Sequence, residues 1–241
     1  MSIDLNSISK LTSLNNDEIH ILIIEFSKFT NQFNQYYKLL SKKEKQRADK
    51  FHFEKDRHVF AITRAILRLM FSQLLKIKPS EIKLKKNDYG KPYLDGSHNS
   101  NIFFNVSHSK NYAIIGINLD SEIGVDIEFV NEKFITDEIA KNYFSKYEID
   151  KYFSLSEHKK VKSFFNLWTR KEAYIKAKGM GLSIPLNSFD ISLDETSPII
   201  IKIGNKINIS DWHINNLSIN NDYCASLIYS GQPKKIIQSV I

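Results

Sequence analysis

Three acidic side chains in this sequence have the spacing of a cation site. Asp126 and Glu128 lie two residues apart in the stretch "IGVDIEFV". On a β-strand they would point to the same side, about 6.6 Å apart at ~3.3 Å per residue. Glu172 would be a third carboxylate if a helix carried it across this strand. Such hard oxygen ligands favour Mg²⁺, Mn²⁺ or Ca²⁺, and a site with room for water and a phosphate favours Mg²⁺. The alternative is the outward polar face of an edge strand.

A second stretch, "NLWTRKEAYIKAKGMGL", places a lysine near the same site. Trp168, Glu172 and Lys176 are four residues apart, so on a helix they form one stripe. Lys176 would then lie beside the cation, where an ammonium suits a phosphate oxygen. Two simpler interpretations remain open: an exposed Glu-Lys pair, and a Trp168 that belongs to the core.

Two further motifs offer contacts for an anion. In "NVSHS", Ser107 and His108 are adjacent, so on a strand they point to opposite faces and do not form a catalytic dyad. Each could donate a hydrogen bond to a phosphate or be an ordinary turn residue. The glycine turn in "NDYGKPYL" could present Lys91 to an anion. The sequence contains neither a phosphate-binding "GxxxxGK" loop nor a "GxGxxG" fingerprint, so nucleoside triphosphates and dinucleotides lack their usual support.

The elements expected to position these residues form two similar sets. The apolar spacing predicts a long helix over 53–75, a hairpin around the turn 107–111, a strand over 123–130, helices over 135–150 and 160–178 that end at Gly179, and two strands within 211–230. This order predicts an α+β fold of two similar halves, residues 1–120 and residues 121–241, joined near Leu119 to Glu122. The second half would carry the metal site.

Composition and charge narrow the class of protein. With 42% hydrophobic and 25% charged residues among 241, the chain is typical of a globular protein. The single Cys224 excludes an internal disulfide and a cysteine metal cluster. The sequence shows no run of about 20 apolar residues and no secretion signal, which predicts a cytoplasmic protein without a membrane span.

The positive charge is concentrated in one segment. Residues 38–91 contain 16 Lys and Arg against six Asp and Glu, a local net charge of +10, although the whole chain carries only +7. A field of this kind attracts phosphates or an acidic partner. The alternative is a solvated, lysine-rich surface.

The motifs occur in the order "YGKP", "FNVSHS", "IGVDIE" and "WTRKEAYIKAKGMGL". This series resembles the Sfp-type 4′-phosphopantetheinyl transferases, over nearly the whole chain. The resemblance implies a pseudo-dimer of two α+β halves, each an antiparallel sheet packed on a long helix, with coenzyme A bound between them. It also implies a monomer.

The resemblance assigns roles to the singled-out residues. One set of residues would hold Mg²⁺, or Mn²⁺ in its place, on the pyrophosphate of coenzyme A. A second set of residues would contact the phosphates. The implied metal ligands are Asp126, Glu128 and Glu172, and the implied phosphate contacts are Lys176, Ser107, His108 and Lys91. Glu172 is also the candidate general base, and whether it acts as base or only as ligand stays open. The 3′-phosphate contacts lie in "SKKEKQRADKF", where Lys43, Lys45, Arg47 and Lys50 are candidates and Arg47 is favoured.

The implied activity is transfer of 4′-phosphopantetheine from coenzyme A to a serine of an apo acyl or peptidyl carrier protein, with release of adenosine 3′,5′-bisphosphate. The alternative is a catalytically degenerate module that binds coenzyme A or a carrier protein. A nucleic-acid binder is suggested by the pI of about 9.2, but no recognition motif supports it. The pathway (fatty acid, polyketide or nonribosomal peptide) and the tolerance for acyl-coenzyme A are not specified by the sequence.

Overall fold

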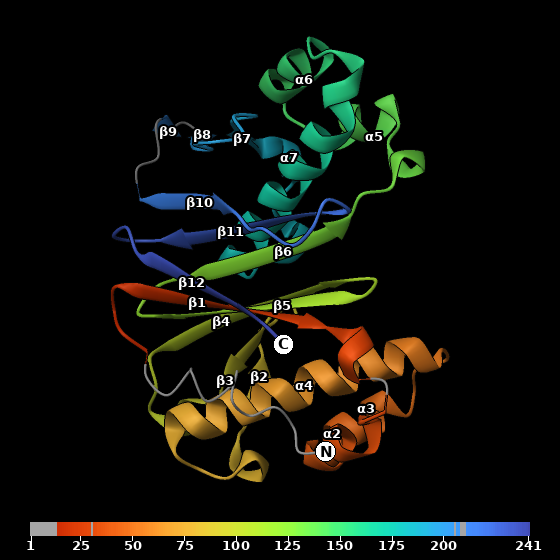
Figure 1. The fold of residues 1–241 in the computed structure, drawn as a ribbon. Helices are drawn as coiled ribbons and strands as arrows, with labels where there is room; N and C mark the ends of the chain where they lie inside the picture. The colour runs from red at the N-terminus through yellow and green to blue at the C-terminus, as the bar shows by residue number, and fades with distance from the viewer. Residues whose placement is uncertain (1–13, 30, 205, 208–210) are drawn as a thin grey trace.

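The computed structural model describes residues 14–29, 31–204, 206–207 and 211–241. Two sheets lie face to face at the centre, and a long helix covers each outer face (Figure 1). The first sheet has the strand order β12 (Lys235–Val240), β1 (Glu18–Glu25), β5 (Tyr112–Leu119), β4 (Ile102–Ser109). The second has the order β10 (Trp212–Asn216), β11 (Tyr223–Ser230), β6 (Ile123–Phe129).

Strand β1 shows why the layers stack in this way. Its six central residues are all buried, as expected for a strand covered on both faces. Alternate side chains point to opposite faces: Leu22 and Ile24 pack into the cluster beneath the helix α4, while Ile21 and Ile23 pack into the cluster between the two sheets. Burial of apolar area on both faces therefore holds the two halves together.

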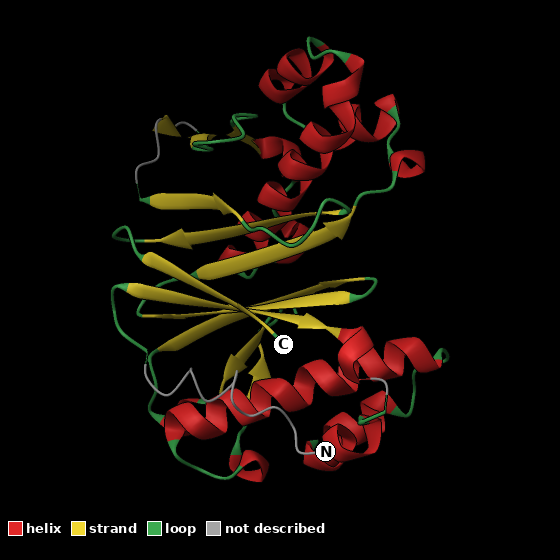
Figure 2. Cartoon of the chain, viewed as in Figure 1, coloured by secondary structure: helices red, strands yellow, loops and turns green. Residues whose placement is uncertain are grey.

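Each half contains one 22-residue helix, α4 (Glu54–Leu75) and α7 (Glu157–Lys178). Helix α7 ends at Gly179, whose φ of +68° is the left-handed conformation that glycine adopts readily. Both helices and this end were predicted, and the α+β fold of two halves, each a sheet on a long helix, is confirmed (Figure 2). By length and composition α4 passes the test for a membrane-spanning helix, but Ile62, Ile66 and Met70 pack into the core.

Shorter elements complete each half. The first half adds α2 (Phe33–Leu39), α3 (Lys42–Ala48), β2 (Leu84–Lys86) and β3 (Pro92–Leu94). The second half adds α5 (Asp137–Tyr143), α6 (Lys146–Phe153), β7 (Phe189–Ile191), β8 (Ile200–Ile203) and β9 (Lys206–Ile207). The predicted hairpin corresponds to β4 and β5, the predicted third strand to β6, and the two strands predicted in the tail to β10 and β11.

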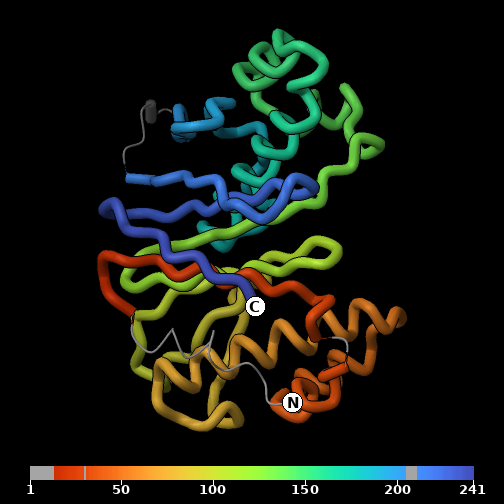
Figure 3. The backbone as a smooth tube through the Cα atoms, in the orientation of Figure 1, coloured from red at the N-terminus to blue at the C-terminus, as the bar shows by residue number. Residues whose placement is uncertain are grey.

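The last strand departs from the sequence-based prediction. Strand β12 follows the second half in the chain but pairs with β1 of the first sheet, and it does so in parallel (Figure 3). The expectation of a purely antiparallel sheet in the first half is therefore wrong at this edge. Neither β1 nor β12 was predicted. The division into residues 1–120 and 121–241 stays a prediction, with the final strand crossing it.

Candidate functional site

Helix α7 approaches the backbone of β6 closely at Gly124. A Cβ atom on Gly124 would lie 2.5 Å from the main-chain nitrogen of Ala177 and would clash with the carbonyl oxygen of Ala173. The absence of a side chain in the strand and the small residues Ala173 and Ala177 in the helix permit this contact. The same crossing carries Glu172 and Lys176 over Asp126, as the sequence predicted for the stripe.

Asp126 is the centre of the resulting cluster. Its side chain is 2% exposed. The Lys176 ammonium lies 2.5 Å from Asp126 Oδ1, and the Ser107 hydroxyl donates a hydrogen bond of 2.8 Å to the same oxygen. Lys176 Nζ also donates to Ser107 Oγ at 2.9 Å. The lysine therefore supplies the positive charge next to this buried carboxylate.

The other two carboxyl groups titrate above their usual range. Desolvation, and secondly the charge of Asp126, raise the pKa of Glu128 to about 7. The same two causes raise the pKa of Glu172. Burial disfavours the charged form of a carboxyl group, and a like charge nearby adds to this effect. The cluster thus holds more acidic groups than the single Lys176 can balance.

The three carboxyl groups of the cluster are ligands of the kind that a divalent cation prefers. Their side chains, however, are not arranged as a complete metal site in this structure. Among the described residues, no group of three His, Cys, Asp or Glu side chains stands ready to hold a metal ion. However, Asp126 Oδ2 is buried and has no hydrogen-bond partner in the described part of the chain, and leaving such an atom without a partner is costly. A cation bound by Asp126, Glu128 and Glu172 would supply that partner and offset the charge imbalance, as hard oxygen ligands do for Mg²⁺.

A basic pocket of about 500 Å³ lies on the other face of β4. Its lining includes Arg47, Arg64, Lys86 and His108. Desolvation lowers the pKa of Lys86, and the charges of Arg47 and Arg64 lower it further. Desolvation also lowers the pKa of Arg64, with the nearby Arg47 among the further causes. These three cations outnumber Asp56, the acidic side chain of the lining, so the cavity favours a polyanionic ligand.

His108 connects this pocket with the carboxylate cluster. Ser107 is buried among the carboxylates while His108 lines the pocket, which confirms that the two side chains point to opposite faces. Although His108 is exposed as a residue, desolvation lowers its pKa, and the second cause is the charge of Lys176. Asp126 also acts on His108 electrostatically. One ligand that extends past His108 could therefore contact both the basic pocket and the carboxylate cluster.

Arg47 is the candidate of the basic segment that faces the pocket. Its guanidinium lies over the Phe60 ring, 4.8 Å from the ring centre. Lys43 lines only a smaller neighbouring hollow of about 230 Å³, which Arg47 also lines. Lys45 donates to the carbonyl oxygen of Lys38 at 3.4 Å. Lys50 lines neither hollow.

Lys91 lies apart from both the carboxylate cluster and the basic pocket. Its ammonium donates to the carbonyl oxygens of Ile123, at 3.1 Å, and Ala177, at 2.8 Å. Desolvation lowers its pKa to about 8. In the same turn, the Asn87 side chain donates to the carbonyl oxygen of Gly179 at 2.6 Å. The "GKP" turn thus attaches the first half to the end of α7, and the predicted phosphate contact of Lys91 stays a prediction.

Sequence reasoning missed residues of the site and residues of the strand edge beside it. Arg64 and Lys86 belong to the pocket wall, and Asn105 and Ser109 contact the edge of β6. The signal for the last two was available, because Asn105, Ser107 and Ser109 are polar at every second position of a strand. Trp168 packs edge-on against Phe134 and Tyr143, so its interpretation as an aromatic packing residue agrees with the structure.

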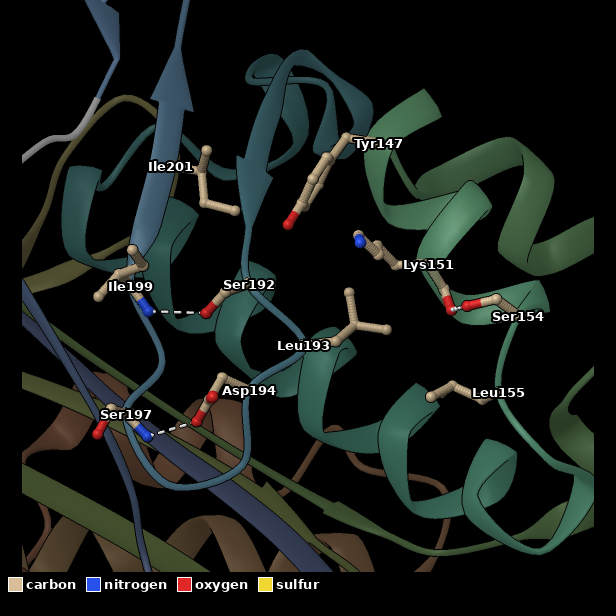
Figure 4. A pocket seen from close by; sticks show the side chains of 10 residues that line it. All are labelled: Tyr147, Lys151, Ser154, Leu155, Ser192, Leu193, Asp194, Ser197, Ile199 and Ile201. Carbon is tan, nitrogen blue, oxygen red and sulfur yellow. Dashed lines mark hydrogen bonds between the residues drawn. The ribbon is translucent and has the colours of Figure 1, made fainter.

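Another hollow, of about 440 Å³, lies between α6 and the strands β7 and β8 (Figure 4). Tyr147 and Lys151 of α6 project toward it from one side, and Ile199 and Ile201 from the other. None of the residues predicted for chemistry lines it. The carboxylate cluster with its basic pocket is therefore the better candidate site.

Two family models match the chain. The family model of the 4′-phosphopantetheinyl transferase superfamily matches residues 122–228, and that of the 4′-phosphopantetheinyl transferase N-terminal region matches residues 25–119. The chain is 35% identical over 187 residues to the 4′-phosphopantetheinyl transferase HetI of Nostoc sp. (strain PCC 7120 / SAG 25.82 / UTEX 2576), covering 77% of this chain and 78% of that protein.

Two further relatives show similar identity. The 4′-phosphopantetheinyl transferase gsp of Aneurinibacillus migulanus is 36% identical over 174 residues, 72% of this chain and 70% of that protein. The 4′-phosphopantetheinyl transferase Sfp of Bacillus subtilis (strain 168) is 31% identical over 170 residues, 70% of this chain and 73% of that protein. A solved holo-(acyl-carrier-protein) synthase from Bacillus anthracis str. Ames, in complex with coenzyme A, overlays on 45% of this chain and 94% of its own, with 21% identity and a TM-score of 0.37.

Proposed function

Because this chain belongs to the Sfp-type 4′-phosphopantetheinyl transferase family, we propose that it transfers the 4′-phosphopantetheine group of coenzyme A to a serine of an apo carrier protein. The observation that carries this function is the position of His108 between a pocket of three cations and a cluster of three carboxyl groups with Lys176. Coenzyme A carries phosphate at two separated positions, the 3′-phosphate and the pyrophosphate, and this arrangement offers one place for each.

The basic pocket suits the 3′-phosphate and the adenosine. Arg47, Arg64 and Lys86 supply the positive charge, and planar guanidinium groups bind phosphate oxygens in pairs. Phe60 and Pro92 supply apolar surface on the same wall. With the nucleotide placed there, the pyrophosphate extends past His108 toward Lys176. This choice favours Arg47 among the candidates of the basic segment.

Asp126, Glu128 and Glu172 would hold Mg²⁺ at the pyrophosphate, where the cation supplies neutralisation of the charge on the phosphoryl oxygens. Lys176 contacts Asp126 in the ligand-free protein. With a cation held by the three carboxylates, Lys176 would be free to bind a phosphoryl oxygen of the substrate. Donors fixed in advance at the place where charge develops lower the barrier of the reaction.

In the reaction, the serine oxygen of the carrier forms a bond to the β-phosphorus, and the bond from that phosphorus to the bridging oxygen breaks. Adenosine 3′,5′-bisphosphate leaves with the electron pair of the broken bond. The serine proton passes to a carboxylate of the site. Glu172 is the candidate, since its carboxyl group is half-buried, has a raised pKa and has no hydrogen bond among the described residues. Both halves of one chain supply residues to the site, so the proposed enzyme needs no second copy and would act as a monomer.

The test is the release of adenosine 3′,5′-bisphosphate, quantified by chromatography after incubation with coenzyme A, Mg²⁺ and an apo carrier protein. Release that requires the carrier and stops on adding EDTA is the expected result. Binding of coenzyme A without any release, over acyl and peptidyl carriers alike, would instead establish the degenerate binding module.

A further inference from the structure

Strand β6 lies at the edge of its sheet, yet three of its N–H groups have partners on β4. The N–H of Val125 donates to Asn105 Oδ1 at 2.9 Å, that of Ile127 to Ser107 Oγ at 3.4 Å, and that of Phe129 to Ser109 Oγ at 3.0 Å. Both strands advance by two residues from one contact to the next. Side chains of β4 therefore take the place of a neighbouring strand along this edge.

Two of these side chains also contact the predicted metal ligands. Ser107 Oγ donates to Asp126 Oδ1 at 2.8 Å, and Ser109 Oγ donates to Glu128 Oε2 at 3.1 Å. A hydroxyl group has one proton and can accept at its lone pairs. Because each serine oxygen accepts a main-chain N–H, its own proton is directed toward the carboxylate.

Each carboxylate thus has one oxygen held by a serine and one left over. Asp126 Oδ2 is buried without a partner, and in the described structure Glu128 makes its one hydrogen bond through Oε2. A hydrogen bond to one oxygen fixes the rotation of the carboxyl group and hence the direction of the other oxygen. Partners of this kind orient metal ligands in many proteins.

We propose that Ser109 and Ser107 are positioning residues, which hold one oxygen each of Glu128 and Asp126 so that the remaining oxygens face the divalent cation. The inference rests on the proposed function, whose metal site it deepens. It adds Ser109, to which the sequence assigned no role, and it gives Ser107 a function besides the predicted phosphate contact.

The strand edge provides a matched control. Asn105 accepts the N–H of Val125 in the same row, but within the described ranges it makes no hydrogen bond to a carboxylate. Asn105→Ala and Ser109→Ala each leave one N–H of β6 without its acceptor, whereas only Ser109→Ala frees a metal ligand. Ser109→Thr keeps the hydroxyl and serves as the rescue variant.

The experiment is a titration with Mn²⁺ that follows the free ion by electron paramagnetic resonance, with and without coenzyme A and without any carrier protein. Loss of an orienting partner lowers metal affinity about 10- to 100-fold. We expect Ser109→Ala and Ser107→Ala to weaken Mn²⁺ binding by about tenfold or more, and Ser109→Thr and Asn105→Ala to stay within about threefold of the unmodified protein. Thermal melting of each variant confirms that it is folded.

An equal loss of affinity in Asn105→Ala would show that the serines act only through the strand edge, and would overturn the inference. Unchanged affinity in Ser109→Ala would overturn it as well, while leaving the proposed metal site intact. If the unmodified protein bound no Mn²⁺ with or without coenzyme A, the proposed metal site itself would be wrong, and this inference with it.

Discussion

Replacing Gly124 by alanine tests whether the contact between β6 and α7 sets the geometry of the site. The added Cβ would lie 2.5 Å from the nitrogen of Ala177, and ordinary contact begins at 3.4 Å. The helix would have to move by about 0.9 Å or more, since the obstacle is backbone and not a flexible side chain. Overpacking of this kind costs about 1–3 kcal/mol of folding stability.

The displacement should affect catalysis as well as folding. Glu172 and Lys176 would move with the helix, and a shift of about 1 Å at a reacting centre can cost about 100-fold in rate, or about 2.7 kcal/mol in activation free energy. We therefore expect Gly124→Ala to fold, to melt at a lower temperature and to lose about 100-fold in kcat/KM for the carrier protein.

The assay is the initial rate of carrier modification, measured beside the thermal melting of the same sample. Gly96→Ala is the control, because a Cβ at Gly96 meets nothing within 4 Å, and it should leave both quantities unchanged. A Gly124→Ala protein with a rate within about threefold of the unmodified one would refute the claim that this contact positions Glu172 and Lys176.

Two further changes have expected outcomes. Lys171→Met should lower the free energy of unfolding, measured by urea denaturation, by about 3–5 kcal/mol, because it leaves the fully buried Glu148 without its 2.5 Å ion-pair partner. The control Lys160→Met removes an exposed pair with Glu157 and should lower it by less than about 1 kcal/mol. Equal losses in the two variants would contradict the account. Arg64→Gln should raise the KM for coenzyme A about tenfold, which corresponds to the loss of about one hydrogen bond to a charged group. The KM for dephospho-coenzyme A, which lacks the 3′-phosphate, should change much less. Steady-state kinetics with both substrates measures the two KM values.

The site residues with local signals were the ones that sequence could predict. Asp126 and Glu128 belong to a strand that period-two spacing identifies, and Glu172 and Lys176 to a helix with four-residue spacing and a glycine end. The strand residues and the helix residues come together because helix α7 crosses β6 at Gly124. A sequence motif can suggest this crossing, but local periodicity does not predict it.

The features that sequence missed depend on contacts between distant segments. Strand β1 contains a short apolar run from Ile21 to Ile24, which by periodicity alone resembles a buried helix segment. Strand β12 pairs with a strand more than 200 residues earlier. Arg64 and Lys86 lie on separate elements, and only the packing of the pocket brings them together. For Lys91 the turn was predicted, but the direction of a long flexible side chain was not.

Intact-mass spectrometry of a purified apo carrier protein tests the central claim most directly. After incubation with this protein, coenzyme A and Mg²⁺, the account predicts a mass gain of one phosphopantetheine, lost both with EDTA and in Glu172→Gln. No gain on fatty-acid, polyketide or peptidyl carriers, with a folded protein that binds coenzyme A, would contradict it.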